Sequence, residues 1–222
     1  MLELLIVIAI IAVLSVVLIV ALNPAETLKK TRDSQRISDL SSLKTAIGIY
    51  TTSKITPYLD GEDGVNPATI NDRCHGGVAL DEKIFVSYPV TGGGAILDVN
   101  PTDAAGGFAQ PANVTAAAAV NGTGWVPVDV ASIAGGSPIS NMPIDPTNDA
   151  TAGTSTLAVI DNSALMYRYA CSKDNLTFEL DTKLESAAYT VDDAKATKDG
   201  GDNTNLFETG TDLSILGATN DF

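Results

Sequence analysis

Histidine is nearly absent from this chain: His75 is the only one, and it lies in a loop-like Cys-His-Gly-Gly stretch. One histidine leaves little room for a Ser-His-Asp hydrolytic site. The nucleophile motif G-x-S-x-G, the metalloprotease motif H-E-x-x-H and a phosphate-binding glycine loop are missing as well. We therefore expect a protein that is not an enzyme and has no catalytic cofactor.

Positive charge is also scarce, with 13 Lys and Arg against 27 Asp and Glu and a formal net charge of −14. The imbalance is concentrated in residues 55–222, which carry a net −16, whereas residues 23–54 carry +3. An acidic domain of this kind repels the phosphates of nucleic acids and favours solubility. We expect no nucleic-acid partner and a soluble acidic head over residues 55–222.

Charge is missing almost entirely from residues 1–22, MLELLIVIAIIAVLSVVLIVAL, where Glu3 is the exception. A helix of this length would span roughly 33 Å, about the thickness of the hydrocarbon core of a bilayer. A secretory signal peptide would begin with basic residues, have a shorter apolar region and end at a small-residue cleavage site. None of these is present, so the run predicts a retained transmembrane helix, with a buried core helix as the alternative.

A second helix is predicted over residues 23–54. Asn23 can cap it, Pro24 suits its first turn, and Glu26 follows three residues after the cap. Pro24 predicts either a kink in one long helix or a restart after a short break. The apolar residues at helical spacing are Leu28, Ile37, Leu40, Leu43, Ile47 and Tyr50. The later half of this amphipathic helix should therefore lie against the head.

The polar face of this helix carries a basic cluster. Such clusters usually form a solvated face, and this one could also meet the acidic heads of neighbouring copies. Its members are Lys29, Lys30, Arg32 and Arg36.

The stretch LELLIVIAIIAVL, followed by a polar amphipathic helix, resembles the N-terminal spine of type IV pilins and pseudopilins. The resemblance is specific over residues 2–22 and extends to about residue 53. In that family a prepilin peptidase removes a basic leader after a glycine, and the new N-terminus is methylated. The mature chain begins with an aromatic residue, Thr and two aliphatic residues before the glutamate. Only Met1 and Leu2 precede Glu3 here, so the resemblance implies further residues upstream.

Glu3 matches the family's glutamate, which is thought to pair with the N-terminal amine of a neighbouring subunit. The resemblance therefore implies that Glu3 is an assembly residue. The simpler interpretation is a tolerated carboxylate in the first turn, which the helix dipole stabilises. The resemblance further implies a single-pass protein of the inner (cytoplasmic) membrane before assembly, and an extracellular filament at the cell surface afterwards. The implied partners are other copies of the chain, the prepilin peptidase and the pilus assembly machinery.

In the head, period-two alternation around Lys173-Asp174 predicts an antiparallel hairpin formed by ALMYRYACS and NLTFELDTKL. Further strands are expected at residues 84–90 and 213–216, with an edge strand at 125–130 because Pro127 cannot donate to a ladder. The expected fold is α+β: a long N-terminal helix packed on a small antiparallel sheet. The segment 91–125, rich in Gly, Ala, Asn and Thr, predicts a long surface loop with at most short strands.

Three further sites are candidates. Cys74 and Cys171 are the only cysteines, and in an exported protein two cysteines often pair, the alternative being two unrelated thiols. Asp199, Asp202 and Asn203 surround paired glycines and offer oxygen ligands for a calcium ion, although such loops are more often plain turns. The pattern N-x-T occurs at Asn113, Asn121 and Asn175, which makes them N-glycosylation candidates.

Three functions compete. The first is a structural subunit of a type IV pilus-like filament, which could serve adhesion, motility, DNA uptake or partner-cell contact. The second is a major pseudopilin of a type II secretion system, and members of that group carry a calcium site near the C-terminus. The third is a single-pass anchored ectodomain. The extended loop region gives the head more variable surface than a minimal piston subunit needs, which favours the pilus.

Overall fold

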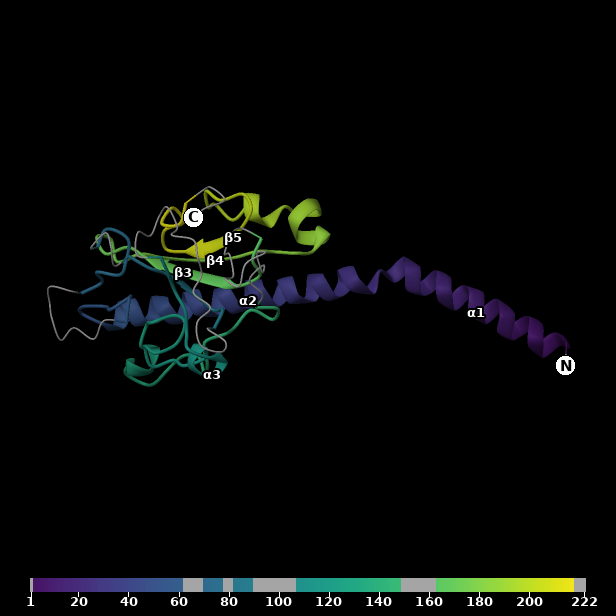
Figure 1. Cartoon of the computed structure of the whole chain (residues 1–222), viewed down its shortest axis with the longest axis horizontal. Helices are drawn as coiled ribbons and strands as arrows, with labels where there is room; N and C mark the ends of the chain where they lie inside the picture. Colours follow the sequence, from purple (N-terminus) through teal and green to yellow (C-terminus); the bar gives the residue numbers. More distant parts are fainter. Residues whose placement is uncertain (1, 62–69, 78–81, 90–106, 149–162, 218–222) are drawn as a thin grey trace.

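The computed structural model describes residues 2–61, 70–77, 82–89, 107–148 and 163–217, without the side chains at positions 17 and 19–22. Figure 1 shows a long helical N-terminal arm that leads into a head built around the second helix. In chain order the elements are α1 (Leu2–Leu22), α2 (Pro24–Ser53), β1 (Ile84–Val86), β2 (Phe108–Ala109), α3 (Val114–Ala117), the 3-10 turn η2 (Val130–Ser132), β3 (Tyr167–Cys171), β4 (Phe178–Thr182), the π-helical turn η3 (Ala188–Asp192), the 3-10 turn η4 (Lys195–Thr197) and β5 (Phe207–Gly210).

The two long helices are separated at Asn23, so of the two predicted alternatives the structure has the restart after a short break and not the kink. Asn23 has a left-handed backbone, with φ 38°, a conformation that Asn tolerates better than most residues. Its Oδ1 accepts a hydrogen bond from the backbone N of Glu26 at 3.5 Å, so the predicted N-cap is also confirmed. Pro24 has no N–H to leave unpaired in the first turn. The second helix therefore restarts after a single residue, and Figure 1 shows the change of direction.

Among the residues that the structure describes, no helix combines the length and the apolar character that crossing a membrane requires.

The described strands form one sheet in the order β2-β1-β3-β4-β5. The predicted hairpin is confirmed as β3 and β4, with Tyr167 opposite Thr182 and Cys171 opposite Phe178. The strand expected at 84–90 is present as β1 and pairs with β3 in antiparallel fashion. β5 pairs with the other side of β4, also in antiparallel fashion.

The prediction of an antiparallel sheet is wrong at one edge, because β1 and β2 are parallel and the sheet is mixed. Residues 87–107 connect them, and a connection of this length allows the return crossover that parallel strands need. The short strand β2 lies in a Gly- and Ala-rich region where no alternating pattern signals it.

Two other expected strands are not formed. Residues 213–216 adopt bends, and their place as the last strand is taken by Phe207–Gly210. Residues 125–130 contribute a single bridge, Asn121 with Asp129, because this segment turns into η2 instead of extending. Of the expected loop 91–125, residues 91–106 lie outside the described residues, and the remainder contains β2 and the short helix α3.

The main core lies between the later half of α2 and one face of the sheet. Leu43 and Ile47 on the helix are fully buried in one cluster with Tyr167, Tyr169 and Phe178 on the strands. Leu40 and Tyr50 belong to the same cluster, as the helical spacing predicted. Leu28, in contrast, is 60% exposed, because the early half of α2 extends beyond the sheet.

The opposite face of the sheet is also covered. Ile215 and Leu216 pack there with Leu206 in a second apolar cluster. Glu179 and Asp181, which alternate with the inward-facing residues, are therefore buried and not solvated. The backbone N–H groups of Ile215 and Leu216 both donate to Glu179 Oε2, each at 2.9 Å, which fixes the C-terminal segment onto β4.

Candidate assembly interface

The arm α1 presents apolar side chains on all sides. The large apolar residues described from Leu2 to Leu18 are 53–77% exposed. Neither core cluster of the described residues includes a member of α1. Figure 1 shows this helix extending away from the head with no other described segment beside it. An apolar surface of this extent is typical of a site that another molecule covers.

Glu3 lies in the first turn of this arm. It forms no ion pair or hydrogen bond with another residue in the described part of the chain. The resemblance implies that Glu3 pairs with the N-terminal amine of a neighbouring copy. Met1, which carries that amine in this sequence, lies outside the described residues. Glu3 is therefore a carboxylate at the tip of an apolar helix, available to a group from another molecule.

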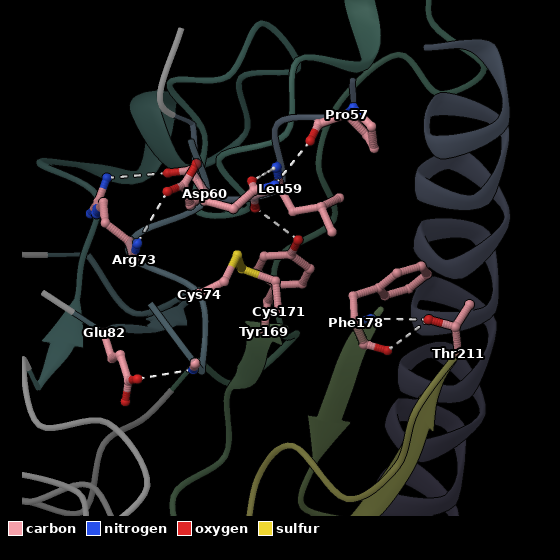
Figure 2. Close-up of a disulfide and its surroundings, with 12 residues drawn as sticks. Pro57, Leu59, Asp60, Arg73, Cys74, Glu82, Tyr169, Cys171, Phe178 and Thr211 are labelled. Carbon is pink, nitrogen blue, oxygen red and sulfur yellow. Dashed lines mark hydrogen bonds between the residues drawn. A yellow bond between two sulfur atoms is a disulfide. The ribbon is translucent and has the colours of Figure 1, made fainter. Parts of the chain in front are cut away.

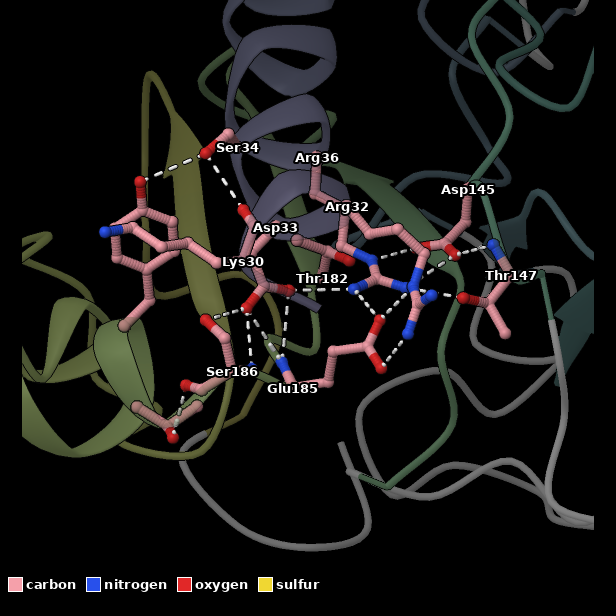
Figure 3. A network of polar contacts seen from close by, with 12 residues as sticks. Lys30, Arg32, Asp33, Ser34, Arg36, Asp145, Thr147, Thr182, Glu185 and Ser186 are labelled. Atoms are coloured by element: carbon pink, nitrogen blue, oxygen red, sulfur yellow. Dashed lines mark hydrogen bonds and ion pairs between the residues drawn. The ribbon is translucent and has the colours of Figure 1, made fainter. Parts of the chain in front are cut away.

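The head is held to α2 by a buried charge network centred on Arg36 (Figure 3). The Arg36 Nε and Nη2 atoms donate to the two carboxylate oxygens of Asp145 at 2.7 and 3.0 Å. Its Nη1 atom donates to Asp33 and to Glu185, each at 2.8 Å. The side chains of Arg36, Asp33 and Asp145 have no exposed surface. One guanidinium thus joins α2 to two distant loops of the head.

Asp33 continues the network into the chain that follows β4. Its carboxylate accepts hydrogen bonds from the backbone N of Glu185 and from both the backbone N and the Oγ of Ser186. Glu185 in turn accepts from Arg32 Nε and Nη2 at 2.6 and 2.7 Å. Figure 3 shows these side chains converging below the helix.

The contacts of this network shift the pKa values of Arg36 and Glu185. Burial opposes the charge on Arg36, but its bonds to Asp145, Glu185 and Asp33 outweigh that effect and raise the pKa of the guanidinium. The hydrogen bond from Arg32, with the help of Arg36, lowers the pKa of Glu185 to about 2. Arg36 and Glu185 are therefore both charged at neutral pH.

Sequence reasoning treated the cluster around Arg36 as a solvated face, and for Arg36 this was wrong. The spacing of Asp33 and Arg36, three residues apart on a helix, was the available signal. The remaining partners, Asp145 and Glu185, lie more than a hundred residues away in sequence and carry no signal of their own. Lys30, by contrast, is exposed and lies 5.9 Å from the centre of the Tyr189 ring.

The disulfide between Cys74 and Cys171 is confirmed, with the two Cα atoms 4.7 Å apart. It joins the segment after α2 to the end of β3, as Figure 2 shows. The chain next to it is held by the backbone N of His75, which donates to Cys171 O at 2.7 Å. A crosslink between positions 97 apart contributes up to about 4.7 kcal/mol in the chain-entropy model.

Hydrogen bonds hold the same segment to the neighbouring strand (Figure 2). Tyr169 OH donates to Leu59 O at 2.8 Å, and Leu59 N donates to Asn71 Oδ1 at 2.7 Å. The lone histidine, His75, is half exposed and lies 3.8 Å from a carboxylate oxygen of Glu82. It therefore takes part in a surface contact beside the disulfide.

The calcium candidates Asp199, Asp202 and Asn203 lie together in the loop before β5. Asp199 accepts hydrogen bonds from the backbone N of Gly201 and of Glu208, and Asn203 Oδ1 accepts from Asn205 N. Several of the oxygens offered to an ion thus already bind the loop's own backbone. No group of three or more His, Cys, Asp or Glu side chains placed to hold a metal occurs among the described residues. The calcium site stays a prediction.

Next to this loop, burial raises the pKa of both Glu179 and Glu208. This pair lies on the covered face of the sheet, apart from α1 and from the Arg36 network.

Asn113, Asn121 and Asn175 are all exposed at the surface of the head. Asn113 caps α3 by accepting from Ala116 N at 2.8 Å, and Asn121 forms a turn with Thr123. Asn175 lies in the turn between β3 and β4. The three sites are thus accessible and stay predictions.

Comparison with protein-family models, with curated proteins and with solved structures found no match to this chain.

Proposed function

We propose that this chain is a structural subunit of an extracellular, type IV pilus-like filament that polymerises through α1. The observation that carries the proposal is the exposure of apolar side chains on every side of a helix of 21 residues. Burying one Leu, Ile or Val side chain contributes about 1.5–3 kcal/mol. Copies that bundle their α1 helices would cover this surface and leave the acidic heads in water. Before assembly, a membrane would cover it.

The rigid connection of the head to α2 also supports this role. A filament subunit must carry load from its spine to its surface. The Arg36 network fixes the head to α2, and the disulfide fixes the segment that follows α2 to β3. The break at Asn23 lets α1 take a direction of its own. In this proposal α1 forms the filament core and α2 forms the part of the spine that the head covers.

Glu3 would set the axial register of the filament. An unpaired carboxylate among packed apolar helices is expensive, and so is an unpaired amine. Pairing Glu3 with the N-terminal ammonium of a neighbour satisfies both groups. Because the attraction is stronger in apolar surroundings, it selects one register among many similar hydrophobic arrangements.

The test is to shear filaments from cells and to identify this chain in them. Glu3→Gln should remain in the membrane fraction, since it carries less charge, and should give a much lower filament yield. Asp192→Asn, which removes one exposed charge from the head, is the matched control and should assemble normally. Normal yield from Glu3→Gln would show that Glu3 has no role in register.

The two other functions give different results in the same experiment. Cells that make no surface filaments but lose secretion when the chain is deleted would favour the pseudopilin. A chain recovered only as single copies in the membrane fraction would favour the anchored ectodomain.

A further inference from the structure

The filament proposal makes no use of the three N-x-T patterns, and the structure distinguishes among them. At Asn121 the side-chain Oδ1 accepts a hydrogen bond from Thr123 Oγ1 at 2.7 Å and a longer one from Thr123 N at 3.4 Å. Gly122 between them has φ +82°, a left-handed conformation that glycine adopts freely and that brings the two side chains together. Asn121 is therefore held in a turn by the threonine of its own pattern.

This arrangement leaves the amide nitrogen open. Within the described part of the chain, Asn121 Nδ2 makes no hydrogen bond, and the residue is exposed. A hydroxyl that donates to an amide oxygen withdraws electron density from the group, so the Nδ2 protons become easier to remove. The geometry thus presents an activated and accessible side-chain amide.

The other two patterns lack this contact. Asn113 Oδ1 accepts from the backbone of α3, at Ala116 N. In the third pattern, Thr177 is half-buried and its hydroxyl donates to Asp212 at 3.4 Å, away from Asn175. Asn121 is the site where asparagine and threonine act together.

Beside Asn121 lies a hollow of about 440 Å³ between the end of α2 and the loop that carries η2. Its wall includes Asn121 itself, the aromatic side chains of Tyr50 and Tyr58, and the polar groups of Lys54 and Asp129. This volume lies in the range of ordinary small-ligand sites, which is roughly 300–1,000 Å³. Aromatic faces combined with polar groups suit a sugar, which has both C–H faces and hydroxyls.

We propose that Asn121 carries an N-linked glycan and that its first sugars are seated in this hollow. In the transfer, a bond forms between Asn121 Nδ2 and the anomeric carbon of the sugar, and the bond from that carbon to the phosphate of a lipid-linked saccharide donor breaks. The bonding electrons of the broken bond leave with the lipid phosphate as its anion, and the proton lost from the amide passes to solvent. Thr123 is the positioning residue, acting through its bond to the amide oxygen.

The site requires that the head be exported, as the filament proposal does, but it does not require a filament. Failure of one proposal is therefore distinguishable from failure of the other. A glycosylated chain that forms no filaments would contradict the filament alone, and filaments of unmodified chain would contradict the glycan alone.

Site occupancy is tested by mass spectrometry of glycopeptides from the full chain isolated from its own cells. We expect a saccharide mass on the peptide that contains Asn121. Asn121→Gln and Thr123→Ala should remove it, Thr123→Ser should keep it because the hydroxyl is retained, and Asn175→Gln should leave it unchanged. An Asn121 peptide recovered only in unmodified form would overturn the proposal, and so would a saccharide mass that persists at this peptide in Thr123→Ala.

The contact between the sugar and the hollow is tested by the rate at which periodate oxidises the attached sugar. The reaction is followed by mass spectrometry of the intact chain. Tyr58→Ala should keep the glycan and raise the oxidation rate several-fold, because the sugar loses its contact with the ring. Tyr189→Ala, a tyrosine outside the hollow, should leave the rate unchanged. Equal oxidation rates in the wild type and in Tyr58→Ala would contradict the proposal that the sugar lies in the hollow, even where the glycan is present.

Discussion

Arg36 shows how a single residue determines the position of the head on the spine. Its guanidinium contacts Asp33, Asp145 and Glu185 and has no exposed side-chain surface. Removing one partner of a buried ion pair leaves the remaining charge buried without compensation. The free energy lost in this way is larger than the net stabilisation that the intact pair provides. The network therefore specifies a position more than it adds net stability.

Replacing Arg36 by Met should lower the free energy of unfolding by about 3–5 kcal/mol, because Asp33 and Asp145 would stay buried without their cation. Urea denaturation of the full chain measures this. The matched control is Lys44→Met on the exposed side of the same helix, which should change the free energy by no more than about 0.5 kcal/mol. Equal stability of the two variants would contradict the role given to Arg36.

Glu185 gives this network a predictable dependence on pH. The pKa of Glu185 is about 2 in the folded chain, where Arg32 and Arg36 lower it, against an ordinary value of 4.5. Because the folded pKa is the lower one, the unfolded chain binds the proton more readily, and the stabilisation is lost as the pH falls from about 4.5 through about 2.

We therefore expect the free energy of unfolding to fall on acidification through this range, and Glu185→Gln to show a flatter acid limb. Denaturation at a series of pH values checks both. An unchanged acid limb in the variant would show that other carboxylates determine the acid response.

At the scale of elements, the junction between α1 and α2 depends on Asn23. Its φ of 38° is unfavourable for Ala but acceptable for Gly, and its side chain caps the second helix. The junction thus depends on backbone conformation as well as on the cap.

Asn23→Ala should destabilise the first turn of α2 by about 1 kcal/mol or slightly more, and Asn23→Gly by only a few tenths. Amide hydrogen exchange at Glu26 and Thr27 reports this turn directly, and Asn23→Ala should exchange several-fold faster. If both variants exchange at the same rate, the left-handed conformation contributes nothing to the break.

At the scale of the whole molecule, the two buried clusters lie entirely within the head and α2. The described part of the head together with α2 thus contains a core, a disulfide and a charge network, while α1 lies outside all three. Folding of the head and association of the chain are therefore separable properties.

A chain of residues 24–222 should fold and remain monomeric in the absence of detergent, whereas the full chain should associate. Light scattering after size-exclusion chromatography measures the mass of each. Association of the shortened chain would place the interface on the head, and a monomeric full chain would contradict assembly through α1.

The sequence by itself determined the two helices, a discontinuity at Pro24 and the β3–β4 hairpin, and it favoured the pairing of the only two cysteines. These depend on local signals: uniform apolarity, Asn23-Pro24, the alternation around Lys173 and a count of cysteines. Each signal lies within one segment or is a property of composition.

Only the tertiary structure decided the parallel edge of the sheet, the burial of Arg36 and of Glu179, and the hollow beside Asn121. Each of these depends on groups far apart in the chain that folding brings together, such as Arg36 with Asp145. A buried charge has the same sequence pattern as a solvated one, because its partners, and not its neighbours in sequence, stabilise it in the interior.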